Sequence, residues 1–301
     1  MLSFAENCLI IAENLRVVLA VGMGGNVQRL VEVRGEFMAE IRRTTLCNAN
    51  ALVSFRPAEY VSQLRSYFDA FVEYIVERLP EQATEFRQRT GEKFRALAAG
   101  GALDTAGSQL DSLERARRAY VLMLLSLADT DQQEAQVTRF AGTHARLYPM
   151  YYQVLALSEL IGRQPAISLV EGFVDQWMAE RTAADLSLED PGRFWDDLEG
   201  PVQQTSQIAV RMHRGKIAFR VSECLWANVM RPLGNPDLSH AFTCYGDFSQ
   251  VPAIHPDFVL TRTVTVMQDG PYCDTCIHDR RFVDEIVHPD RGFFDELEME
   301  Q

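Results

Sequence analysis

The stretch SQIAVRMHRGKIAFRVSE, residues 206–223, decides the fold. Apolar and polar residues alternate over 208–212 and again over 217–221, with Arg214-Gly215 between the two runs. Alternation with period two is typical of a strand with one buried face, and a short connection containing glycine is typical of a hairpin. The stretch therefore predicts two antiparallel strands.

The sequence after this hairpin predicts two further strands of the same sheet and a short helix. DFVLTRTVTVMQDG (257–270) is a β-branched, alternating run that Asp269-Gly270 closes, and YCDTCIHDRRFV (272–283) follows it as the expected hairpin partner. ECLWANVMRPLG (223–234) predicts a short helix that ends at the Pro232–Gly234 turn.

The chain before residue 204 is predicted to be helical. AEYVSQLRSYFDAFVEYIVERL (58–79) spaces its apolar residues three and four positions apart, which indicates one buried stripe on a helix. The glycines of VVLAVGMGGNVQRL (17–30) lack the spacing of a dinucleotide-binding fingerprint, so we predict a tight loop or close contact between helices there. The fold class is thus α+β: an N-terminal helical region followed by helices packed on a small antiparallel β-sheet.

Composition and charge exclude several classes of protein. The 301 residues are 47% hydrophobic and 24% charged, which is an ordinary globular balance. A net charge of −13 argues against a nucleic-acid partner or an anionic membrane surface. The first residues lack the basic leader of a signal peptide, and the most apolar run (119–128) is too short to span a bilayer. We expect a cytoplasmic protein whose six cysteines are reduced.

Four of the six cysteines lie between residues 224 and 276, and two of them are the pair in DGPYCDTCIHDRR (269–281). Structural zinc would need a second such pair, and a regular strand points Cys273 and Cys276 to opposite faces. A redox pair would need a helix N-terminus. The third interpretation is a polar active-site pocket at one end of the sheet. Its candidate residues are Cys244, Asp247, Arg262, Thr263, Cys273 and Asp274.

The order of these pieces resembles the L-2-amino-thiazoline-4-carboxylic acid hydrolase family. RVSECLWANVM (220–230), GNPDLSHAFTCYGDF (234–248) and PDFVLTRTVTVMQDGPYCD (256–274) carry the resemblance. Its motif residues fall on Cys224, Cys244, Asp247, Arg262, Thr263, Cys273 and Asp274. The aromatic residue usual after the last Cys-Asp pair is replaced by Thr275-Cys276.

The likeness runs back through the helices to about residue 131 and leaves residues 1–128 outside it. We therefore divide the chain into a helical region, 1–128, and a hydrolase-like α+β domain, 129–301. The helical region is expected to be a dimer interface, a lid or a small-ligand chamber. A homo-oligomer formed through these helices is one expected partner.

The resemblance implies hydrolysis of a C–N bond in a cyclic amidine or isothiourea of a small amino-acid-like substrate. In this hypothesis Cys244 attacks as a thiolate, activated by Arg262 or by His278. Asp247 or Asp274 holds the cationic amidine, because a carboxylate forms a charge-assisted pair with it.

The remaining roles follow from the same hypothesis. Arg262 binds the substrate carboxylate, Cys273 completes the catalytic set, and Thr263 and Cys224 belong to the substrate-binding wall. No cofactor is expected. The alternative is a zinc ion or another divalent metal, held by the cysteines and Asp247, that supplies a hydroxide to the same carbon.

Two other functions stay open at this point. One is a biosynthetic enzyme of the same fold that performs ring formation or another C–N step. The other is a small-molecule binding or assembly protein without turnover. Labelling with iodoacetamide separates these classes, because a catalytic thiol reacts faster than an ordinary one and is protected by ligand.

Overall fold

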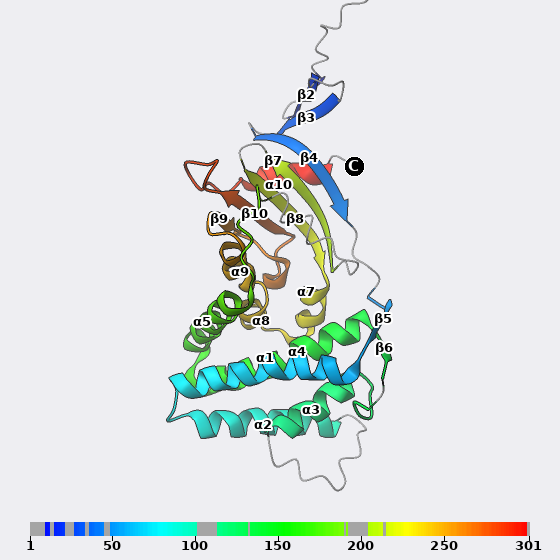
Figure 1. The fold of residues 1–301 in the computed structure, drawn as a ribbon, viewed down its shortest axis with the longest axis vertical. Helices are drawn as coiled ribbons and strands as arrows, with labels where there is room; N and C mark the ends of the chain where they lie inside the picture. The colour runs from blue at the N-terminus through cyan, green and yellow to red at the C-terminus, as the bar shows by residue number, and fades with distance from the viewer. Residues whose placement is uncertain are drawn as a thin grey trace, which may run out of the picture. The chain divides into compact units, whose positions relative to one another are not determined.

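The computed structural model describes residues 10–12, 15–21, 27–33, 36–44, 49–100, 113–131, 133–189, 191, 204–212 and 215–299. The chain forms two compact units, each discontinuous in sequence (Figure 1). The sheet unit comprises Met1–Leu46, Arg181–Cys224 and Asp247–Gln301. The helical unit comprises Cys47–Glu180 and Leu225–Gly246. The fold class is α+β, as predicted.

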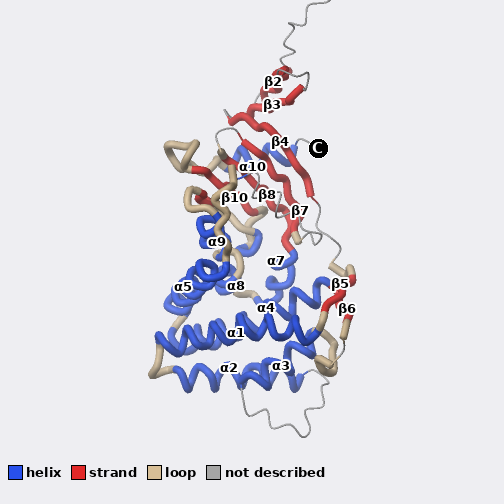
Figure 2. The backbone as a smooth tube through the Cα atoms, in the orientation of Figure 1, coloured by secondary structure: helices blue, strands red, loops and turns tan. Residues whose placement is uncertain are grey.

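The sheet unit is built on one antiparallel sheet with the strand order β1-β2-β3-β4-β7-β8-β10-β9. Figure 2 draws the strands in red. Its strands are β1 (Ile10–Ala12), β2 (Leu15–Val21), β3 (Val27–Val33), β4 (Glu36–Thr44), β7 (Thr205–Met212), β8 (Lys216–Cys224), β9 (Phe258–Thr261) and β10 (Cys273–Asp279). The described part of this unit also contains the helices α9 (Gly246–Ile254) and α10 (Arg291–Met299) and a short 3-10 turn, η2 (Val266–Gln268).

The predicted hairpin at the centre of this sheet is confirmed. β7 and β8 are antiparallel neighbours, and Gly215 lies between them with a φ of 66°, a left-handed conformation that favours glycine. A Cβ at this position would lie 2.8 Å from Cδ2 of Phe282. Glycine therefore permits both the left-handed conformation of the turn and the close approach of Phe282, which lies in the loop after β10.

The two faces of the sheet carry different helices. On one face α10 packs over the apolar cluster of Val210, Met212, Ala218, Tyr272, Cys276, Phe293, Phe294 and Leu297. On the other face α9 packs over the cluster of Leu188, Ala209, Ile217, Phe219, Val251, Phe258, Leu260 and Ile277. Alternate residues of β7, β8 and β10 fall into different clusters, as the pleat of a strand requires.

The described part of the helical unit contains long helices and a small two-stranded antiparallel sheet. Its helices are α1 (Pro57–Arg78), α2 (Ala83–Gly100), α3 (Leu113–Leu124), α4 (Arg139–Ile161), α5 (Arg163–Arg181), α7 (Leu225–Met230), η1 (Arg231–Leu233) and α8 (Pro236–Phe242). The two-stranded sheet pairs β5 (Leu52–Phe55) with β6 (Ala135–Thr138), which are separated in the chain by α1, α2 and α3. The predicted stripe on α1 is confirmed by the burial of Leu64, Phe68, Phe71 and Ile75.

The helical prediction for the chain before residue 204 is wrong for β1 to β4, for β5 and for β6, which are strands. The glycine-rich stretch does not join helices, because β2 and β3 on either side of it pair from Val21↔Val27 to Leu15↔Val33. Residues 22–26, which hold these glycines, lie outside the described residues. The apolar, β-branched runs here are short enough for either structure, and their pairing with each other decides for strands.

One predicted strand is also shorter than expected, since β9 ends at Thr261 rather than continuing to residue 270. Among the helices that the structure describes, none combines the length and the apolar character that a membrane span requires. The predicted domain division at residue 128 concerns the extent of the family likeness, and it stays a prediction.

Candidate active site

A charged pair lies in the sheet unit where β9 ends and α9 begins. Nη2 of Arg262 lies 2.5 Å from Oδ2 of Asp247, and Nε of Arg262 donates to Oγ1 of Thr275 at 2.8 Å. The guanidinium also lies 5.5 Å above the ring of Phe248. The Arg262 side chain is 7% exposed and the Asp247 side chain 46%. A buried cation thus fixes a carboxylate that a ligand can reach.

Cys273 lies beside this pair on the same face of the sheet. Its sulfur accepts a hydrogen bond from the backbone N–H of Val266 at 3.4 Å. Burial raises the pKa of the Cys273 thiol to about 11; Arg262 opposes this, whereas Cys224 and Asp247 add to it. The four side chains are therefore close enough to interact electrostatically, and Cys273 is a protonated thiol at neutral pH.

Asp274 follows Cys273 in the strand and points to the opposite face. Oδ1 accepts the backbone N–H groups of Thr263 and Val264, each at 2.8 Å. Oδ2 accepts the Thr263 hydroxyl and lies 3.1 Å from Nε2 of His288. Burial alone would raise the pKa of Asp274, but the hydrogen bonds from His288, Thr263 and Val264 outweigh it and lower the pKa. Asp274 therefore anchors the segment that presents Arg262.

A chain of polar side chains continues from Asp274 behind the sheet. Nδ1 of His288 lies 2.9 Å from the Thr261 hydroxyl, which lies 2.8 Å from Nε2 of His278. The Thr261 hydroxyl also donates to the backbone oxygen of Cys276 at 3.4 Å. Nδ1 of His278 is buried and has no hydrogen-bond partner among the described residues.

His278 cannot serve as the positively charged activator considered above. Its side chain is fully buried, and burial, Lys216 and His288 lower its pKa to about 4. A neutral imidazole does not stabilise a thiolate by charge. Of the two activators predicted for Cys244, Arg262 is the one that carries a positive charge.

The other predicted residues are placed as follows. Thr263 is exposed as a residue, but its hydroxyl is bound to Asp274 rather than directed to a ligand. Cys224 is half-buried at the end of β8. Cys244 is half-buried in the turn between α8 and α9, within the helical unit, where the Thr243 hydroxyl lies 3.6 Å from its sulfur. Cys244 is therefore a candidate site residue on the basis of the sequence alone.

The cysteine pair of β10 does not converge. The pairing of β10 with β8 runs without a register shift from Cys273 to His278, so the two cysteines face opposite sides as predicted. Cys276 packs in the apolar cluster under α10. Within the part of the chain that the structure describes, no three His, Cys, Asp or Glu side chains are grouped as a metal ion would need. Whether the protein uses a cofactor stays a prediction.

The sequence missed two polar partners of the site, Thr275 and His288. Thr275 faces Arg262 only because it is two residues from Cys273 on the same strand, a periodicity that could have identified it. His288 lies in an irregular segment fourteen positions beyond Asp274, and no local pattern marks it.

The fold and this geometry define the class of protein: an α+β protein with a fixed, partly exposed carboxylate and a buried guanidinium at one end of an antiparallel sheet. Residues 143–277, a little under half of the chain, match the family model of L-2-amino-thiazoline-4-carboxylic acid hydrolase. This match confirms the resemblance and includes all the motif residues predicted from it. No curated protein and no solved structure matches the chain.

Proposed function

We propose that the protein is a hydrolase that opens a cyclic amidine or isothiourea in a small amino-acid-like substrate by cleaving a C–N bond. The observation that carries the proposal is the Arg262–Asp247 pair, which lies inside the matched region and has one buried and one reachable partner. Such a pair is suited to a ligand with a cationic group, because the buried guanidinium holds the reachable carboxylate in a fixed position.

Asp247 is the better of the two carboxylates for holding the amidine cation. Its side chain is 46% exposed, whereas that of Asp274 is 5% exposed and both oxygens of Asp274 already accept hydrogen bonds. Arg262 is the group proposed to bind the substrate carboxylate, with Thr275 holding its Nε. Cys273 contributes a neutral thiol to the wall of the site.

Cys244 is the proposed nucleophile. Its thiolate attacks the ring carbon that bears two nitrogens and one sulfur, and a bond forms from the thiol sulfur to that carbon. The ring C–N bond then breaks and the departing nitrogen takes a proton. Water adds to the same carbon, and the bond to Cys244 breaks to return the free thiol. The product is an S-carbamoylated amino acid with a free amine.

The direct test uses the purified full chain and L-2-amino-thiazoline-4-carboxylate. Mass spectrometry should show a product heavier by one water molecule, and an amine reagent should react with it. A product that reacts with a thiol reagent instead would mean that the ring C–S bond breaks. Absence of turnover with this compound and with related cyclic amidines would contradict the proposal.

Two variants test the roles. Cys244→Ser and Asp247→Asn should each lower kcat/KM at least about a hundredfold, in line with the loss of a nucleophile or a charged binding group. Cys276→Ala, on the other face of the sheet, and Asp237→Asn, an exposed residue of α8 paired with Arg163, are the matched controls. Near-normal turnover by Cys244→Ser would exclude the thiol mechanism, and elemental analysis of the active enzyme would then test the metal-hydroxide alternative.

A further inference from the structure

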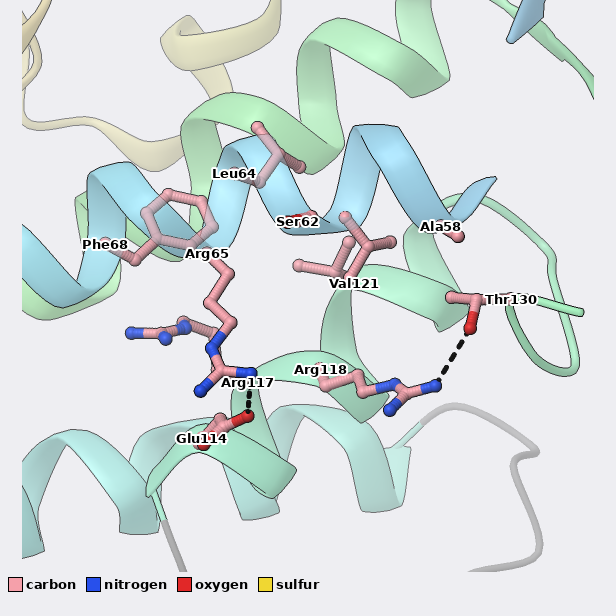
Figure 3. Close-up of a pocket in the computed structure, with 11 residues that line it drawn as sticks. Ala58, Ser62, Leu64, Arg65, Phe68, Glu114, Arg117, Arg118, Val121 and Thr130 are labelled. Atoms are coloured by element: carbon pink, nitrogen blue, oxygen red, sulfur yellow. Dashed lines mark hydrogen bonds and ion pairs between the residues drawn. The ribbon is translucent and has the colours of Figure 1, made fainter. Parts of the chain in front are cut away.

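A pocket of about 180 Å³ lies between α1 and α3, outside the region that matches the family (Figure 3). It is lined by Ala58, Val61, Ser62, Leu64, Arg65, Phe68, Glu114, Arg117, Arg118, Val121 and Thr130. A protein cavity of about 150 Å³ accommodates benzene, so this pocket has the capacity for one small ring or a short chain.

One part of the lining is apolar. Leu64 and Phe68 on α1 and Val121 on α3 are buried, and Val61 is half-buried beside them. In Figure 3 the side chains of Leu64, Phe68 and Val121 lie above the guanidinium groups of Arg117 and Arg118. An apolar group of a ligand would remove this surface from water, which contributes roughly 25 cal/mol per Å².

The other part of the lining is cationic, and two of its three arginines are committed to the protein. Arg117 is 3% exposed, donates to Gln153 at 3.1 Å and pairs with Asp69. Arg65 pairs with Asp69 at 3.1 Å and with Glu114 at 2.8 Å. The two guanidinium groups are balanced in charge by the carboxylates of Asp69 and Glu114, and these ion pairs connect helix α1 with helix α3.

Arg118 is the cation in excess of this balance. It is exposed at the mouth of the pocket, and its one hydrogen bond to the described part of the chain runs to the Thr130 hydroxyl at 3.0 Å. A guanidinium has five N–H donors and binds a carboxylate with two of them in parallel. A single excess positive charge beside an apolar pocket fits a ligand with one negative charge and an apolar body.

We propose that this pocket binds a small monocarboxylate with an apolar body about the size of a benzene ring, and that Arg118 binds the carboxylate group. The site gives α1 and α3, which lie outside the region that matches the family, a role of their own: they form a ligand chamber. It does not depend on the hydrolase activity, so either proposal can fail alone.

The experiment is a titration of the full chain with 4-fluorobenzoate, followed by fluorine NMR. We expect saturable binding of one ligand per chain. The neutral isostere 4-fluorobenzamide should bind about tenfold more weakly, because it loses a charge-assisted pair with Arg118.

The variants compare two arginines of the same helix. Arg118→Gln should weaken 4-fluorobenzoate binding about tenfold, whereas Arg115→Gln, exposed on α3 but outside the pocket, should leave it unchanged. Ser62→Trp, at an exposed position of the lining, should block binding by filling the mouth. Circular dichroism of each variant verifies the fold. Absence of saturable binding to the natural protein, or equal affinity for the benzoate and the benzamide, would overturn the proposal.

Discussion

Two adjacent buried residues, Cys273 and Asp274, have opposite tendencies to ionise. Burial acts against the charged form of both, but Asp274 accepts four hydrogen bonds whereas the Cys273 sulfur accepts one. The pKa of Asp274 is therefore lowered and that of Cys273 is raised to about 11. For these two side chains, the number of hydrogen bonds they accept, rather than the depth of burial, decides which of them is ionised.

Replacement of this carboxylate gives the first prediction. Asp274→Asn should lower the free energy of unfolding by about 2–3 kcal/mol at pH 7, because an amide cannot accept all four hydrogen bonds. Since the pKa of Asp274 is lowered in the folded state, its stabilisation is complete above the ordinary value of 3.8 and is lost as the pH falls through the folded-state pKa.

Urea unfolding at pH 7 and at pH 3 measures this effect. The difference in the free energy of unfolding between the natural protein and Asp274→Asn should be smaller at pH 3 than at pH 7. The exposed Asp237→Asn should have nearly the same free energy of unfolding as the natural protein at either pH. A difference that stays constant between the two pH values would contradict the role given to the ionised carboxylate.

The sequence identified some site residues but not their partners. The alternation of β10 correctly predicted that Cys273 and Cys276 face opposite sides. It did not reveal that Thr263 and Asp274 bind each other on the far side from Arg262, because this contact depends on where β9 ends. Register between strands is a non-local property, and a single sequence carries little information about it.

At the scale of elements, α10 closes the face of the sheet that holds the Asp274 chain. Phe293 and Phe294 are fully or almost fully buried, and the ring of Phe294 stacks on His288 with 5.5 Å between centroids. The helix thus stabilises the sheet through apolar contact and also fixes the histidine that binds Asp274.

We therefore expect Phe294→Ala to lower the free energy of unfolding by about 3–5 kcal/mol, since it removes a fully buried aromatic ring. Phe282→Ala is the control, because that residue is 54% exposed, and the substitution should lower the free energy of unfolding by less than about 1 kcal/mol. Thermal or urea unfolding monitored by circular dichroism gives both values. An equal decrease in the free energy of unfolding for the two variants would show that α10 is not part of the core.

Elements with local signals were predicted well and those with distant partners were not. The stripe on α1 and the hairpin β7–β8 depend on spacing within one segment, and both are confirmed. β4 is different, because its partner β7 lies far along the chain, at Met38↔Met212 and onward. Its strand structure depends on that partner rather than on its own sequence.

At the scale of the whole molecule, the sheet unit takes strands from both ends of the chain. β4 pairs with β7 from Thr44↔Gln207 to Met38↔Met212, so residues before 45 complete a sheet whose other strands lie after 204. The family match begins at residue 143 and does not include β4. The matched region therefore omits strands of the sheet unit, which contains all of the motif residues except Cys244.

A fragment of residues 129–301 should consequently fail to fold as the full chain does. Without β4, the strand β7 becomes an open edge, and unpaired edges promote association between chains. Size-exclusion chromatography should show oligomers or aggregates, and thermal unfolding should lose its cooperative transition. A monomeric fragment with the unfolding transition of the full chain would contradict this expectation.

The strand β10, with the sequence CDTCIHD, has a consequence for how this protein can vary. All seven residues are buried, although two are acids and one is a histidine. A substitution at a buried polar position of β10 is constrained in two ways. The new side chain has to match the volume of the old one, and it has to make hydrogen bonds in the same directions. A mutational scan of β10 should therefore tolerate fewer substitutions than a scan of the neighbouring strand β9, whose two buried residues, Phe258 and Leu260, are apolar.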